Sequence, residues 1–203
     1  MPSTAPQLVW SATPDKTNHK TKGYTSKVIF NFQCTTPIAV SDSTDILDTI
    51  ISSTFNYKGS NILDSNYFLN CDGRAFRITM YFLKNLDGDN MNISQELYDI
   101  NETTNYIITG PTPTITSAIG GDTLSKYECD ITTFLDASTG SYFIQGLGNI
   151  VYANSLDGTN VVMTPFRGNG VYIGSVSNRN SIRILNKCGD DIQILSLIIE
   201  EVS

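Results

Sequence analysis

Residues 181–203 read Ser-Ile-Arg-Ile-Leu-Asn-Lys-Cys-Gly-Asp-Asp-Ile-Gln-Ile-Leu-Ser-Leu-Ile-Ile-Glu-Glu-Val-Ser. Two runs rich in isoleucine flank a Gly189-Asp-Asp191 turn signal, and β-branched residues suit a pleated, half-buried surface. Because glycine supplies the backbone angles that a tight reversal needs, this stretch predicts a β-hairpin at the end of the chain.

The last of these runs is apolar at both alternating sets of positions. Ile192, Ile194, Ser196 and Ile198 are predicted to share one face of the strand, and Leu195, Leu197 and Ile199 to share the other. A strand that is apolar on both faces needs a cover on both sides. We therefore expect it to lie inside a sandwich or at an oligomer interface, with Leu195, Leu197 and Ile199 as candidate contacts to a second copy.

Short alternating runs punctuated by Gly, Asp and Asn recur along the rest of the chain. They predict roughly eight to ten strands in an antiparallel β-sandwich with jelly-roll topology, an all-β fold formed by one domain over residues 24–203. Pro37 is expected to end the first strand, and Gly146-Leu-Gly148 and Gly168-Asn-Gly170 are interpreted as bends. Asp157-Gly158 predicts a hairpin turn. The expected strands include 27–34, 75–83, 105–109, 124–135, 141–145, 148–153, 160–164 and 170–176.

One segment changes to a helical period. Ile46 and Ile50 are four residues apart, as are Leu47 and Ile51, so residues 43–53 predict a short helix. Ser43 or Thr44 is the expected N-cap, and Asp45 suits the first turn.

Residues 1–23 are predicted to form an extended N-terminal arm, rich in Pro, Thr, Asn and Lys. Leu8, Val9 and Trp10 are its apolar exception, and Trp10 is the chain's one tryptophan. We expect these three residues either to pack at the edge of the domain's own core or to dock on a neighbouring subunit.

The net charge of −7 argues against nucleic-acid binding, which calls for a basic face or arm. No apolar run approaches the length of a membrane span. The polar, proline-containing start resembles no signal peptide, so we expect a protein made in the cytoplasm. Its widely separated cysteines, Cys34, Cys71, Cys129 and Cys188, are expected to be free and mostly buried thiols, although two disulfides are arithmetically possible.

Candidate catalytic and metal-binding groups are few. The single histidine, His19, lies in the arm, which argues against a Ser-His-Asp site and excludes multi-histidine metal sites. Asp87, Asp89 and Glu96 resemble part of a calcium loop, but the glycine is misplaced for that motif, so a turn is expected. Glu128, Asp130 and Asp136 are the acidic residues from which a glycoside hydrolase would have to draw its pair. We expect no cofactor, no metal and no enzymatic activity.

The polar arm, the many strands, the short early helix and the apolar last strand together resemble viral jelly-roll structural proteins, and also trimeric heads of the tumour-necrosis-factor and C1q type. The resemblance implies a non-enzymatic capsid, vertex or spike-head component of the virion. Its partners would be other virion proteins and its own copies, in a homotrimer or homopentamer. The alternative is a carbohydrate- or receptor-binding module, with Trp10 or Tyr172 stacking on sugars. The third hypothesis is a glycoside hydrolase that uses a pair of acidic residues.

Overall fold

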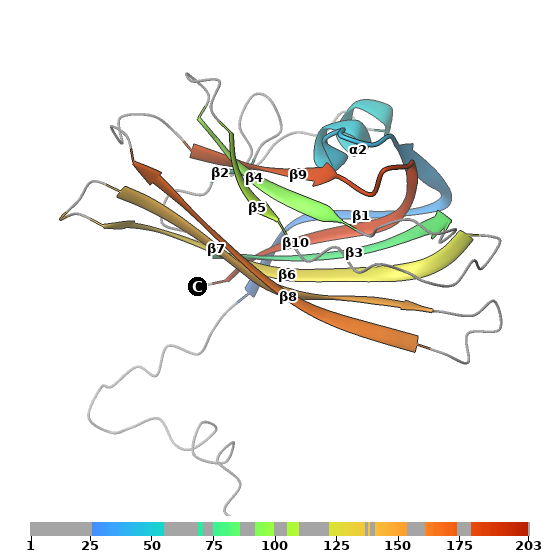
Figure 1. The fold of residues 1–203 in the computed structure, drawn as a ribbon. Coiled ribbons are helices and arrows are strands. Elements are labelled where there is room, and N and C mark those ends of the chain that lie inside the picture. Colours follow the sequence, from blue (N-terminus) through green and yellow to red (C-terminus); the bar gives the residue numbers. More distant parts are fainter. Residues whose placement is uncertain are drawn as a thin grey trace, which may run out of the picture.

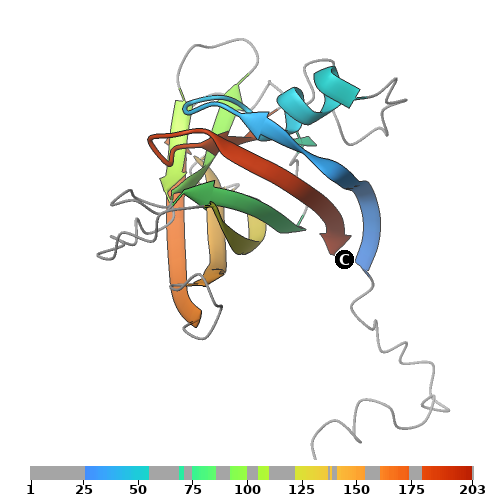
Figure 2. The same cartoon turned by 90° about the vertical axis from the view of Figure 1, so that its right-hand side faces the viewer.

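In a computed structural model, the chain forms two antiparallel sheets and one helix. The structure describes residues 26–54, 69–70, 75–85, 92–99, 105–109, 122–136, 138, 141–153, 161–173 and 180–202. The six-stranded sheet contains, in spatial order, β1 (Ser26–Val40), β10 (Ile192–Val202), β3 (Ala75–Asn85), β6 (Asp122–Asp136), β7 (Ser141–Ala153) and β8 (Val161–Ile173). The four-stranded sheet contains β2 (Leu69–Asn70), β9 (Asn180–Asn186), β4 (Ile93–Asp99) and β5 (Asn105–Thr109). Figure 1 shows the two sheets as layers, and Figure 2 shows them turned by 90°.

The strand order confirms the predicted all-β sandwich and its jelly-roll topology. Four antiparallel pairs are nested one inside the next along the chain: β1 with β10, β2 with β9, β3 with β6, and β4 with β5. The four pairs fold over one another into two sheets, because β10 also pairs with β3 and β9 also pairs with β4. The result is the double-sheet jelly roll.

Strands β7 and β8 are an addition to this wrapped body. They form an antiparallel hairpin that extends the six-stranded sheet beyond β6. Both strands run straight through the two glycine pairs, so the prediction that these pairs are bends is wrong. Gly146 and Gly148 lie within β7, and Gly168 and Gly170 lie within β8, where Gly146 pairs with Gly168. The predicted turn at residues 157–158 lies outside the described residues.

Helix α2 (Ile46–Thr54) confirms the predicted short helix and lies at one end of the sandwich (Figure 1). The sequence suggested Ser43 or Thr44 as the cap, but the N-cap is Asp45, whose Oδ1 accepts the Asp48 backbone N–H at 2.8 Å. The apolar stripe of the helix, made of Ile46, Leu47, Ile50 and Ile51, is buried in the core. The cap therefore sets where the helix begins, and the packing of its apolar stripe provides most of its stability.

The carboxyl group of Asp45 makes stability depend on pH. Burial raises the pKa of Asp45 from 3.8 to about 6, although the Asp48 amide and the Arg183 guanidinium, 3.8 Å away, partly oppose the shift. Between about pH 4 and pH 6 the folded state binds more protons than the unfolded state, so the free energy of unfolding falls as pH rises through that window. The full shift corresponds to about 3 kcal/mol.

We expect Asp45→Asn to remove this component, because the amide still accepts the capping hydrogen bond but does not titrate. Urea unfolding at pH 4 and pH 7 gives the change in the free energy of unfolding between the two pH values. This change is expected to be smaller in the variant than in the wild type. An unchanged pH dependence in Asp45→Asn would contradict the assignment, and Asp48→Asn, at an exposed position on the same helix, is the matched control.

The chain's last two strands do not form the predicted hairpin. β9 belongs to the four-stranded sheet and β10 to the six-stranded sheet, so the Gly189 turn carries the chain from one sheet to the other. Gly189 has the expected positive φ of 83°. The Asn186 side-chain amide donates to the carbonyl oxygens of Val40 at 2.9 Å and Asp190 at 2.8 Å, which ties the crossing to the end of β1.

A β-bulge changes which residues of β10 face the core. The pairing of β10 with β3 shifts register between Ile194 and Ser196, so Leu195 is an extra residue. As a result Ile192, Ile194, Leu197 and Ile199 all face the core and are completely buried, whereas Leu195 and Ile198 are half-buried. The two faces predicted for this strand are therefore wrong, because strict alternation holds only in the absence of a bulge.

Strand β1 differs from its prediction in two ways. It continues past Pro37 to Val40, because β1 is an edge strand whose register with β10 shifts between Gln33 and Ile38. A second shift, between Val28 and Phe30, leaves Val28 exposed while Phe30 and Phe32 are buried. Strict alternation along residues 27–34 predicts that Val28 shares the face of Phe30 and Phe32, and the register shift is the reason it does not.

The three described cysteines, Cys34, Cys129 and Cys188, are thiols, and Cys129 and Cys188 are buried. Cys71 lies outside the described residues. Burial raises the pKa of the Cys129 thiol to about 12, so this side chain is an unreactive part of the core.

Candidate interaction surface on the six-stranded sheet

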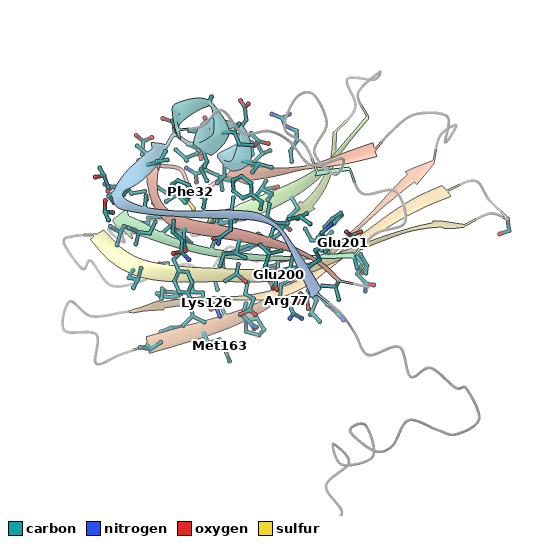
Figure 3. The ribbon with its side chains drawn as sticks, turned by 180° about the vertical axis from the view of Figure 1, so that it is seen from behind. Phe32, Arg77, Lys126, Met163, Glu200 and Glu201 are labelled. Atoms are coloured by element: carbon teal, nitrogen blue, oxygen red, sulfur yellow. The ribbon has the colours of Figure 1, made fainter. Side chains whose placement is uncertain are left out.

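The six-stranded sheet has one face toward the core and one face outward. On β3 and β6, alternate residues such as Phe82 and Tyr127 are buried, and the residues between them, such as Tyr81 and Lys126, point away from the core. Figure 3 shows the difference: Phe32 lies on the side of helix α2, whereas Lys126, Arg77 and Met163 lie on the opposite side of the sheet. We call this opposite side the outer face.

Two ion pairs occupy the middle of the outer face. Arg77 on β3 makes a two-pronged contact with Asp130 on β6, with Nε–Oδ1 at 2.7 Å and Nη2–Oδ2 at 3.0 Å. On β6 itself, Lys126 Nζ lies 2.6 Å from Glu128 Oε2. All four side chains are more than a third exposed, so the value of each pair for stability is below about 1 kcal/mol. Their effect on the surface is that each cation is neutralised by its neighbour.

Large apolar side chains gather beside these ion pairs, on β6 and the β7–β8 hairpin. Leu124, Val161 and Met163 are 52%, 61% and 64% exposed. The strand register places Leu83 opposite Leu124 and Val151 opposite Met163, and both of these side chains are half-buried. We call the five residues Leu83, Leu124, Val151, Val161 and Met163 the hairpin patch. Exposed apolar groups that cluster on one face are typical of interaction sites.

The contacts predicted from the last strand lie elsewhere. Leu197 and Ile199 are completely buried in the subunit's own core, where they offer no surface to a neighbour. Leu195, at the bulge, is half-buried. Leu8, Val9 and Trp10 lie outside the described residues, as does the rest of the predicted arm.

Among the side chains that the structure describes, the candidate chemical groups do not assemble into a reactive centre. Glu128 and Asp130 do lie on one face of β6, but each is engaged by a cation on an open sheet. The Asp136 side chain, His19, Asp87, Asp89 and the Glu96 side chain are outside what the structure describes. In the part of the chain that is described, no three His, Cys, Asp or Glu side chains cluster to hold a metal ion, and no helix has the length and apolarity needed to cross a membrane.

The hairpin patch was missed, although the sequence carries a signal for it. Val161, Val162 and Met163 are consecutive apolar residues on one strand, so both faces of that strand must carry apolar side chains. Val162 packs against the core, and Val161 and Met163 consequently point outward. Residues 192–199 are also apolar at both sets of alternating positions, but there the bulge at Leu195 breaks the alternation.

No protein-family model matches the chain, and no curated protein sequence matches it. Among solved structures, the CBM2 module of the evolved Dit of Lactobacillus casei BL23 phage J-1 is 8% identical, with a TM-score of 0.26 over 88% of this chain and 97% of that one. Peanut lectin with a nine-residue peptide is 11% identical, with a TM-score of 0.24 over 89% and 99%. Arcelin-5, a lectin-like defense protein from Phaseolus vulgaris, is 10% identical, with a TM-score of 0.26 over 88% and 98%. These similarities carry no argument about function.

Proposed function

We propose that this chain is a non-enzymatic structural protein of a virion, a capsid, vertex or spike-head component that assembles as a symmetric homotrimer or homopentamer. The observation that carries the proposal is a jelly-roll body whose widened six-stranded sheet exposes an apolar patch. Jelly rolls occur both in viral capsid proteins and in lectins. The fold alone therefore does not distinguish a structural role from sugar binding, and the exposed side chains have to be considered.

The outer face supports association with protein better than association with sugar. Exposed aromatic rings suit stacking on sugars, and the two rings suggested for that role, Trp10 and the Tyr172 side chain, lie outside what the structure describes. Tyr81, 37% exposed, is the one exposed aromatic ring among the side chains that the structure describes. The aliphatic groups around it suit a protein interface, where apolar side chains form the centre and polar ones the rim.

Native mass spectrometry and light scattering test the proposal. We expect a closed oligomer of three or five copies at micromolar concentration, and we expect peptides of this chain in gradient-purified virus particles after external protease treatment. A compact monomer at high concentration would overturn the assembly, and absence from the particles would overturn the virion role. Glycan-array binding by the monomer would support the alternative, a carbohydrate-binding module.

The arm gives a second test of assembly. We expect deletion of residues 1–23 to leave the domain folded, because the described strands begin at Ser26, and to weaken assembly. Trp10→Ala is expected to raise the concentration of half-assembly about 30-fold, the effect typical of one tryptophan at the centre of an interface. Light scattering across a dilution series measures this, with the thermal melt as the folding control. Normal assembly of both variants would remove the arm from the interface.

A further inference from the structure

We propose that the hairpin patch lies at the rotation axis of a homo-oligomer, where it meets the same patch on other copies of this chain. This inference rests on the proposed function and names the surface that assembly would use. In a closed oligomer, residues near the axis face their own counterparts. A charge placed there faces the same charge, which is costly, so an axis favours neutral apolar groups.

The charge of the patch fits that position. The chain as a whole carries −7, so two copies repel each other on average. Among the described side chains, the one charged residue that lies within the patch is Lys126, which Glu128 neutralises at 2.6 Å. Arg167, the next exposed charge along β8, is four residues beyond Met163, about 13 Å along the strand. Copies can therefore approach through the patch without bringing like charges together.

The same charge pattern argues against other occupants. Nucleic acid and anionic membranes select clusters of unpaired cations. The patch offers aliphatic side chains and one neutralised lysine instead. Its best counterpart is an aliphatic, uncharged surface, and the patch itself is such a surface.

The position of the patch in the fold also suits contact between copies. Val151, Val161 and Met163 lie on the added hairpin, outside the four wrapped strand pairs. Strand β8 is an edge of its sheet, with β7 as its one neighbour there. A second copy can thus contact the hairpin without displacing any strand of the jelly roll.

Two opposite charges at one exposed position test the inference. Met163→Lys and Met163→Glu are each expected to raise the concentration of half-assembly at least about 100-fold, because each places like charges at the axis. Mixing the two variants is expected to restore assembly in part, since opposite charges then meet at most contacts of a ring of three or five copies while one pair of like charges remains. Val161→Lys with Val161→Glu repeats the test. Val28→Lys, at a 53% exposed position on the opposite edge strand, is the matched control and should assemble normally.

Light scattering gives the mass, and far-ultraviolet circular dichroism verifies folding. If the wild type assembles and both Met163 variants assemble equally well, the surface is wrong while the proposed function stands. If each variant is monomeric and the mixture stays monomeric, the patch is not at the axis, and the inference is overturned. A wild type that is monomeric at every concentration would overturn the proposed function together with this inference.

Discussion

Gly148→Ala is expected to lower the free energy of unfolding by about 3 kcal/mol or more, or to prevent folding. A Cβ at Gly148 would overlap the backbone carbonyl oxygen of Glu128 and would lie 2.8 Å from Cζ of Phe166. Backbone on a neighbouring central strand cannot move aside as a flexible side chain can. The Phe166 ring is also constrained, because it stacks on the buried ring of Tyr127 at 5.3 Å.

Gly189→Ala is the matched control for this substitution. No atom lies within 4 Å of a Cβ added there, and its cost arises only from the φ of 83°, so we expect about 1 kcal/mol. Urea unfolding followed by circular dichroism measures both variants. Equal costs for Gly148→Ala and Gly189→Ala would show that the close approach of β6, β7 and Phe166 is incorrect.

Leu197→Ala is expected to cost about 3 kcal/mol, because it removes a completely buried side chain and leaves a cavity. Ile198→Ala, next in sequence but half-buried on the outer face, is expected to cost about 1 kcal/mol. The contrast tests the bulge at Leu195, without which Leu197 would lie on the opposite face. Chemical denaturation compares the two variants, and an equal or larger cost for Ile198→Ala would contradict the register.

The sequence contained most of the information about secondary structure. Residues 105–109 form β5 at the predicted bounds, and the alternation over 75–83 and 124–135 identified β3 and β6. The helical period of Ile46 and Ile50 identified α2. These signals are local, since each depends on which side of a strand or helix faces apolar surroundings.

Pairing and register could not be obtained in the same way. The turn at Gly189 has the residues of a hairpin, yet its two strands find partners far away in sequence, such as Met80 for Leu197. The bulges at Leu195 and near Val28 move side chains to the other face without a local sequence signal. The interaction surface depended on these registers. The apolar run at residues 161–163 was visible, but which of its residues faced outward was not.

The pairing of Ser26 with Val202 has a consequence for synthesis of the protein. Strand β1 cannot join the six-stranded sheet before β10 is present, because β10 lies between β1 and β3. On the ribosome, β1 and one edge of β3 therefore stay without their partner strand until residues 192–202 have been synthesised. Such long-range closure slows folding and exposes strand edges to aggregation. We expect recombinant yield to improve at low temperature or with chaperones, and a chain truncated before Ile192 to accumulate as insoluble material.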